Sequence, residues 1–181
     1  MDGGSAGRSA EVETLSWPRA ESGARPVSGA HADRATRFLP PGQIAVSGEP
    51  TAVTSILGSC VAVCITDPIA RVGGLTHYLL PSPLGCRTPE HYGTLAVPLL
   101  IERVIALGGR RGRLEAKVFG GARMIGTPQA RREHVGERNS EIAFELLKGA
   151  GIPILAEDVG GTRARKLIYY TDDATAWVRR L

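Results

Sequence analysis

Alternation of β-branched residues with smaller ones marks positions 60–66 as a β-strand, because β-branched residues are poor helix formers. The pair Asp67-Pro68 then favours a turn. A second apolar stretch, residues 71–80, follows after only a short connection. We therefore predict a β-hairpin.

The loop of this hairpin determines which side chains face one another. A four-residue loop over 67–70 places Cys60 directly opposite His77. Directly opposed side chains have Cβ atoms roughly 4.5 to 5.5 Å apart, close enough for a thiol and an imidazole to share a proton. A bulge at Gly73-Gly74 is the alternative, and it would shift the register by one residue and turn the histidine to the other face.

The remaining pattern predicts two helices and several further strands. Apolar residues at helical spacing predict one helix that follows a loop ending at His91 and runs to about Leu107. Asn139 is expected to be the N-cap of the second helix. Further strands are predicted over 43–47, 51–57, 114–119, 153–159 and 166–171, with a short edge segment over 174–181. This order indicates an α+β fold with mainly antiparallel strands and two principal helices, not a repeating βαβ pattern.

Residues 1–36 differ in composition from the rest of the chain. They are rich in Gly, Ala, Ser, Arg and Glu, show no sustained period, and cannot bury enough apolar surface to offset the entropy of ordering. We expect this segment to be a disordered N-terminal extension. Residues 37–181 then form a single domain, since the 43% hydrophobic content of the chain allows it one good core.

The charge and hydropathy patterns exclude some classes of partner. A formal net charge of +4 is small, and no Lys/Arg run is interleaved with aromatic residues, so no nucleic-acid partner is expected. No apolar run approaches the roughly 18 residues of a membrane span. No charged-then-apolar signal sequence begins the chain. These patterns indicate a cytoplasmic protein without membrane insertion.

The 3 cysteines have irregular spacing and do not resemble a disulfide framework, in keeping with a reducing compartment. Together with His77 and His91 they raise the alternative of a zinc site. On a strand, however, Cys60 and Cys64 lie about 13 Å apart at roughly 3.3 Å per residue, whereas a zinc-bound sulfur lies about 2.3 Å from the metal. No metal and no cofactor are therefore expected, and Cys64 and Cys86 are interpreted as small buried hydrophobes.

Four blocks of the sequence resemble one known family, in the same order. They are LGSCVAVCITDP at 57–68, GGLTHYLLP at 73–81, AKVFGGARM at 116–124 and GERNSEIAFELLKGAGIPILAEDVGGTRARKL at 136–167. These blocks resemble the CheD family of chemoreceptor glutamine deamidases. The resemblance extends from about residue 41 to the end of the chain.

The resemblance implies a layered α/β/β sandwich and a cytosolic enzyme that hydrolyses the side-chain amide of particular glutamines on methyl-accepting chemoreceptors. It implies Cys60 as the nucleophile and His77 as the base. The third member is Thr54, six residues before the cysteine, which would orient the imidazole ring. The implied partners are the cytoplasmic helices of chemoreceptors and, in addition, a CheC-type phosphatase.

These residue types suit amide hydrolysis. A free cysteine has a pKa near 8.5 and is mostly protonated at neutral pH, so we expect the imidazole to shift the pair towards thiolate and imidazolium. Backbone N–H groups near Ser59 and Cys60 are candidates for the oxyanion hole by position. The hydroxyls of Ser55 and Ser59 are expected to be structural.

Other functions stay open on the residues alone. One is a non-catalytic regulatory module that binds chemoreceptors or a CheC-type phosphatase. Another is a cysteine protease or an amide-transferring enzyme that uses the same pair. Arg123, Arg138 and Arg165 are interpreted as solvated charges, with docking to an acidic receptor helix as the alternative.

Overall fold

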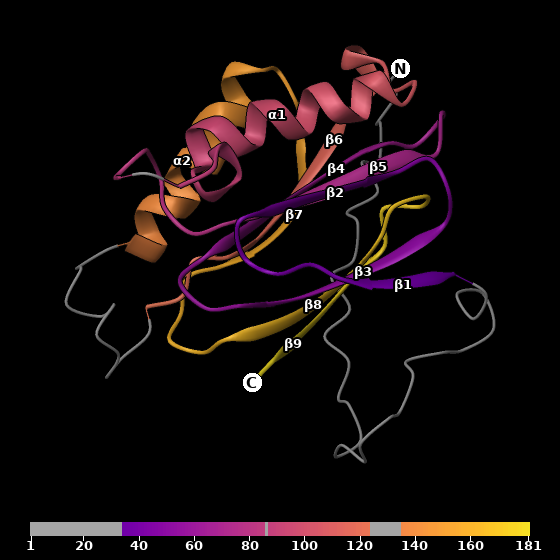
Figure 1. Cartoon of the computed structure of the whole chain (residues 1–181). Coiled ribbons are helices and arrows are strands. Elements are labelled where there is room, and N and C mark those ends of the chain that lie inside the picture. Colours follow the sequence, from indigo (N-terminus) through magenta and orange to yellow (C-terminus); the bar gives the residue numbers. More distant parts are fainter. Residues whose placement is uncertain (1–33, 86, 124–134) are drawn as a thin grey trace, which may run out of the picture.

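The computed structural model of the chain describes residues 34–85, 87–123 and 135–181, which form three layers (Figure 1). Two helices lie on one side of a five-stranded sheet, and a four-stranded sheet lies on its other side. This α/β/β arrangement confirms the predicted fold class. No helix in the described ranges is long and apolar enough to cross a membrane.

The five-stranded sheet has the order β2-β5-β4-β6-β7, and only its β6/β7 pair is parallel. Its strands are β2 (Gln43–Ser47), β4 (Val61–Asp67), β5 (Val72–Tyr78), β6 (Glu115–Gly120) and β7 (Ile154–Val159). The four-stranded sheet has the order β1-β3-β8-β9, and only its β1/β3 pair is parallel. Its strands are β1 (Ala35–Phe38), β3 (Thr51–Leu57), β8 (Arg165–Tyr170) and β9 (Ala176–Arg180).

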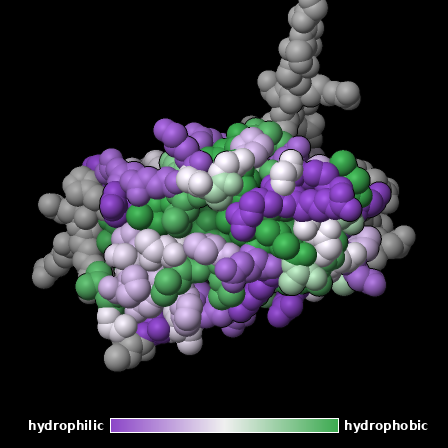
Figure 2. Space-filling model, turned by 90° about the horizontal axis from the view of Figure 1, so that it is seen from above, coloured by the Kyte–Doolittle hydropathy of each residue, from purple (hydrophilic) through white to green (hydrophobic). Residues whose placement is uncertain are grey.

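The helical layer consists of α1 (Gly93–Ala106) and α2 (Val135–Gly149), accompanied by short 3₁₀ helices at Pro89–His91 and Arg111–Arg113. Apolar residues at helical spacing give α1 one buried face, which packs on the five-stranded sheet. The opposite face of the layer is mixed: Figure 2, which looks down on it, shows apolar residues between groups of hydrophilic ones.

Strand β4 is buried along its whole length because it is the central strand of the middle layer. Its residues alternate between two cores, as the two faces of a strand must. Val61 and Val63 belong to the core beneath the helices. Ala62 and Cys64 belong to the core between the two sheets, so Cys64 is the small buried hydrophobe that was predicted.

The predicted β4–β5 hairpin forms, but its register differs by two residues from the predicted one. Ala62, not Cys60, is directly opposite His77. The loop does contain four residues, but they are Pro68 to Arg71, because Asp67 remains in the strand and its carboxylate accepts the N–H groups at the start of the turn. The alternative bulge is wrong, since the two glycines of β5 pair in regular register with β4.

Two residues have surroundings that the sequence pattern did not predict. Asn139 is not an N-cap: α2 begins at Val135, and Asn139 is a buried residue of the helix. Arg165 is not a solvated charge, because only 2% of it is exposed and its guanidinium donates to the carboxylate of Asp158 and to the backbone carbonyl of Gly160.

The predicted strands over 43–47 and 51–57 are confirmed as β2 and β3, and the other predicted strands are present with ends within two residues of the prediction. The predicted domain start at residue 37 falls inside β1. The prediction of a disordered extension covers residues 1–36. Its last residues are ordered, because Arg34 binds Asp172 and β1 begins at Ala35. Residues 1–33 lie outside the described residues.

Candidate active site

Cys60 lies in the turn that connects β3 to β4, where the chain crosses from the four-stranded to the five-stranded sheet. Its thiol is free and partly exposed. The end of β6 holds this turn, since the N–H of Gly121 donates to the Cys60 carbonyl and the N–H of Ala122 donates to the Gly58 carbonyl, at 2.9 and 2.8 Å. Gly120 must be glycine here because it has φ +115° and a Cβ would lie 2.2 Å from the Cys60 carbonyl oxygen.

The structure brings Cys60 and His77 together. The distance from His77 Nε2 to Cys60 Sγ is 3.1 Å. The two residues are diagonal neighbours, not directly opposed ones, because His77 pairs with Ala62 and the cysteine precedes Ala62 by two positions. A shift of two residues leaves both side chains on the same face, and the length of the imidazole spans the diagonal.

The other ring nitrogen of His77 contacts two oxygens. Nδ1 lies 2.8 Å from Ser55 Oγ and 3.2 Å from the Leu39 carbonyl oxygen. Ser55 in turn donates its hydroxyl hydrogen to the same Leu39 carbonyl, at 2.8 Å. A carbonyl only accepts, so the proton belongs on Nδ1, and Nε2 keeps its lone pair for the thiol hydrogen.

The residue that contacts the ring is therefore Ser55 and not the expected Thr54. Successive residues of a strand point to opposite faces. Val53 and Leu57 pack between the sheets, on the face that Ser55 shares, whereas Ala52 packs in the cluster on the outer face. Thr54 alternates with Ala52 and so lies on the outer face. Only its backbone serves the site, by accepting the N–H of Leu39 at 2.8 Å.

The segment before β2 holds His77 in place. The carbonyl of Leu39 accepts a hydrogen bond from the ring Nδ1–H, and the N–H of Gly42 donates to the His77 carbonyl at 2.6 Å. His77 itself is fully buried. Its ring therefore has a fixed position and a defined tautomer before any substrate arrives.

Burial favours the uncharged form of both members of the pair. Desolvation raises the pKa of the Cys60 thiol, although the backbone N–H groups of Gly58 and Cys60 hydrogen-bond the sulfur and oppose this rise. Desolvation also lowers the pKa of His77, against the effect of the Leu39 carbonyl. Both shifts favour a neutral thiol beside a neutral imidazole over the thiolate and imidazolium expected from the sequence.

Because the backbone N–H groups of Gly58 and Cys60 lower the pKa of the thiol, they lie near the sulfur, where the oxygen of an attacked carbonyl would also develop its negative charge. The sequence placed the candidate donors near Ser59 and Cys60, so Cys60 is common to both sets, and the oxyanion hole stays a prediction. Ser59 lies between Gly58 and Cys60, and its carbonyl points away to accept a hydrogen bond from α2.

The described residues hold no group of three or more His, Cys, Asp or Glu side chains that could bind a metal ion. Of the residues considered for zinc, Cys64 is buried between the sheets, and the His91 ring contacts the hydroxyl of Thr88. Cys86 lies outside the described residues. The groups near Cys60 are those that acyl transfer requires: a thiol, a base and backbone N–H groups.

A cysteine thiol in contact with a histidine imidazole, at one end of an α/β/β sandwich, is the arrangement used by the class of cysteine-dependent hydrolases and acyl transferases. A family model described as "CheD chemotactic sensory transduction" matches residues 79–180. The chain belongs to the CheD family.

Individual relatives agree with this assignment. The chain is 53% identical over 148 residues to a protein of Anaeromyxobacter dehalogenans named "Probable chemoreceptor glutamine deamidase CheD 1", covering 82% of this chain and 86% of that protein. It is 40% identical over 150 residues to a Bordetella petrii protein named "Probable chemoreceptor glutamine deamidase CheD", covering 81% and 66%. Among solved structures, the Bacillus licheniformis hypothetical protein YfiH has a TM-score of 0.41 at 16% identity, over 63% of this chain and 49% of that one.

Proposed function

We propose that the chain is a chemoreceptor glutamine deamidase, which hydrolyses the side-chain amide of particular receptor glutamines to glutamate and ammonia. The observation that carries this proposal is the 3.1 Å contact between Cys60 Sγ and His77 Nε2 beside two backbone donors. The curated relatives of A. dehalogenans and B. petrii, whose names state this activity, support the choice of substrate.

The first half of the reaction would form a thioester. Nε2 of His77 removes the thiol proton as Cys60 Sγ attacks the glutamine carbonyl carbon, since burial keeps both groups neutral until then. The backbone N–H groups of Gly58 and Cys60 stabilise the oxyanion. The C–N bond then breaks, and His77 gives its proton to the departing nitrogen, which leaves as ammonia.

The second half would release glutamate. His77, neutral again, takes a proton from a water molecule as the water oxygen attacks the thioester carbon. The C–S bond breaks and the sulfur recovers a proton from His77. During both steps Ser55 Oγ and the Leu39 carbonyl accept hydrogen bonds from Nδ1–H and hold the ring in one orientation.

The proposed setting is the cytoplasm, where the glutamine-bearing helices of methyl-accepting chemoreceptors are accessible. The partial exposure of Cys60 is consistent with a macromolecular substrate that docks over the β3–β4 turn. A CheC-type phosphatase is proposed as a second partner on the ground of family membership.

The experiment compares the wild-type chain with Cys60→Ala on a purified chemoreceptor cytoplasmic fragment, by ammonia release and by mass spectrometry of the fragment. Wild type is expected to convert glutamine to glutamate without cutting the backbone, and Cys60→Ala is expected to release no ammonia while keeping its circular dichroism spectrum. Undiminished release by the variant would exclude Cys60 as the nucleophile. Receptor binding without release by either protein would favour the non-catalytic regulatory module.

A further inference from the structure

Asn139 connects helix α2 to the turn that carries the nucleophile. Its side-chain Nδ2 donates to the Ser59 carbonyl and to the Leu79 carbonyl, both at 2.9 Å. Both neighbours are carbonyl oxygens, so the atom that faces them must be the nitrogen. One amide group thus joins the peptide before Cys60 to the residue that follows β5, the strand of His77.

Asn139 completes a set of three carbonyls in the cysteine turn that are all held from outside. The N–H of Ala122 donates to the carbonyl of Gly58, and the N–H of Gly121 donates to the carbonyl of Cys60. The carbonyl between them, that of Ser59, is held by Asn139. Because a trans peptide points its C=O and its N–H in opposite directions, fixing the Ser59 carbonyl also fixes the N–H of Cys60.

The direction of that N–H matters for the chemistry. The backbone N–H groups of Gly58 and Cys60 lower the pKa of the Cys60 thiol and so lie near the sulfur, and an oxyanion formed by attack of this sulfur would lie within reach of the same donors. Among the residues that the structure describes, Asn139 is the side chain that binds the Ser59 carbonyl and so sets the plane of the Ser59–Cys60 peptide. The other two carbonyls are held by backbone groups, which substitution cannot remove.

Asn139 is not the best choice for stability alone. Its Oδ1 is buried and has no partner among the described residues, and an unpaired buried acceptor destabilises the folded state. The residue is nevertheless fixed on both sides, because the hydroxyl of Tyr78 donates to its backbone carbonyl at 2.5 Å. The unpaired Oδ1 and the two hydrogen bonds donated by Nδ2 together indicate that the side chain serves as a double donor.

We infer that Asn139 is a positioning residue for deamidation: it holds the Ser59–Cys60 peptide so that the Cys60 N–H faces the sulfur and the oxyanion. The inference rests on the proposed function for its effect on turnover. The predicted alignment of the Cys60 N–H with the thiol does not depend on the proposed function. Ammonia release and the alkylation of Cys60 therefore distinguish a failure of the proposed function from a failure of the positioning role of Asn139.

The experiment uses the full chain with Asn139→Ala and Asn139→Ser, and with Glu141→Gln, on the exposed side of the same helix, as the matched control. The first measurement is ammonia release from the chemoreceptor fragment. For Asn139→Ala we expect kcat to fall about 10- to 100-fold, with KM within about two-fold of wild type. Asn139→Ser, which can donate to one carbonyl only, should lie between, and Glu141→Gln should match wild type.

The second measurement needs no glutamine substrate. The rate of alkylation of Cys60 by iodoacetamide is followed on the Cys60 peptide by mass spectrometry across a range of pH. Loss of the aligned N–H should move the thiol transition of Asn139→Ala to higher pH, which a purely structural change in α2 would not do. Circular dichroism establishes folding, and if Asn139→Ala does not fold, Asn139→Ser decides.

Folded Asn139 variants with wild-type kcat and an unchanged alkylation profile would overturn the inference. If the wild-type chain releases no ammonia, the proposed function fails, and the alkylation profile alone then decides whether Asn139 aligns the peptide. A shifted profile supports the inference in that case, and an unshifted one overturns it.

Discussion

The two ends of strand β4 hold their buried polar groups in opposite ways. At its first residue lies the candidate active site, in which Cys60 and His77 are desolvated, uncharged and held by backbone groups and one hydroxyl. At its last residue, the fully buried carboxylate of Asp67 pairs with Arg113, whose Nη2 lies 2.7 Å away. The same carboxylate accepts three backbone N–H groups.

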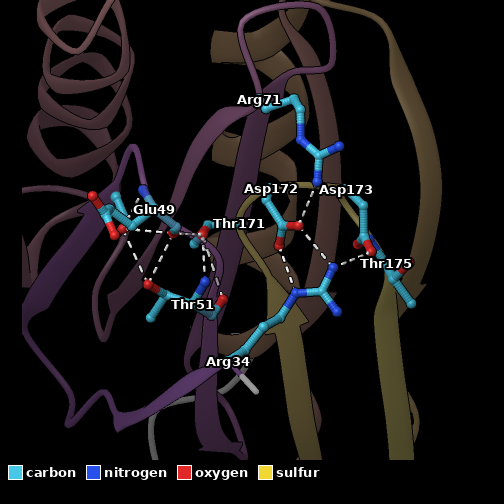
Figure 3. Close-up of polar contacts among 9 residues, drawn as sticks. Arg34, Glu49, Thr51, Arg71, Thr171, Asp172, Asp173 and Thr175 are labelled. Carbon is cyan, nitrogen blue, oxygen red and sulfur yellow. Dashed lines mark hydrogen bonds and ion pairs between the residues drawn. The ribbon is translucent and has the colours of Figure 1, made fainter. Parts of the chain in front are cut away.

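A second ionic cluster lies at the Asp67 end. The carboxylate of Asp172, which is also buried, accepts hydrogen bonds from Nε and Nη2 of Arg34 at 2.8 and 2.7 Å (Figure 3). It also accepts one from Nη2 of Arg71, in the hairpin loop, at 3.0 Å. Arg34 also contacts Asp173 and lies over the ring of Tyr170. These contacts join the start of β1, the hairpin loop and the end of β8.

The contrast between the two ends of β4 indicates that one end contributes to stability and the other to catalysis. Where charges are paired, the protonation state is fixed: burial alone would raise the pKa of Asp67, but the hydrogen bonds from Arg113 and the loop outweigh it and hold that pKa well below its ordinary value. At the other end no residue that the structure describes supplies a charge partner to Cys60 or His77, which leaves a proton free to pass between sulfur and nitrogen. We expect changes at the first end to affect turnover and changes at the second to affect unfolding.

The largest effect is expected for His77→Gln. Glutamine fills a similar volume and keeps polar contacts but cannot accept the thiol proton, so kcat for ammonia release should fall about 10²- to 10⁴-fold. The free energy of unfolding should change by about 1 kcal/mol or less. Steady-state kinetics and urea titration measure the two quantities. A variant that keeps more than about a tenth of the wild-type kcat would rule out His77 as the base.

The reverse pattern is expected for Asp67→Asn. The amide oxygen can still accept the loop N–H groups, but the amide nitrogen then faces Arg113 and the N–H of Arg110. The free energy of unfolding should fall by about 1.5 to 3 kcal/mol, with kcat unchanged. Glu49→Gln, an exposed carboxylate near the same end, is the control and should change stability by less than about 0.5 kcal/mol. A fall in kcat without unfolding would show that the two ends are coupled.

A smaller effect is expected within the active site for Ser55→Ala. The His77 ring keeps the Leu39 carbonyl as an acceptor, so we expect kcat to fall about 3- to 10-fold, near 1 kcal/mol. Thr54→Val is the matched control, because its side chain lies on the outer face of β3, and it should keep wild-type kcat. The opposite result, a loss for Thr54→Val and none for Ser55→Ala, would restore Thr54 as the residue that orients the ring.

The choice between Ser55 and Thr54 also shows what the sequence could predict. Cys60 and His77 were correctly brought together because strand residues alternate with period two, so a register error of two residues left them on one face. In β3 the apolar residues occupy both alternations, Ala52 and Ile56 on one and Val53 and Leu57 on the other. The pattern there does not identify the buried face.

Asn139 and Arg165 were misread for a related reason. Each was judged by its neighbours in sequence, whereas its partners lie elsewhere: Asn139 binds carbonyls 80 and 60 residues away, and Arg165 binds Asp158 and Gly160 across the turn between β7 and β8. Nearly all strands followed from hydrophobic periodicity, whereas the layered arrangement was implied by the resemblance to the CheD family. Contacts between polar side chains and distant backbone groups do not follow from periodicity.

The smallest expected effect is a difference in the pH range over which each end of β4 changes the free energy of unfolding. Burial would raise the pKa of Asp172, but Arg34 and Arg71 hold it below its ordinary value of 3.8, so the stability it contributes is present above that value and is lost as pH falls through the lower folded pKa. Asp172→Asn should therefore be less stable than wild type by about 1 kcal/mol at pH 7. This difference should shrink only below about pH 4.

His77 titrates in another window. Its pKa is lowered by burial from 6.5, so the unfolded chain binds a proton more readily, and stability falls as pH drops from above 6.5 towards the folded pKa. Urea titrations across pH 3 to 8 should show that His77→Gln removes the upper loss of stability and that Asp172→Asn reduces the lower one, to which Asp67 also contributes. If either variant changed the other's window, the neutral and ionic ends of β4 would not be independent.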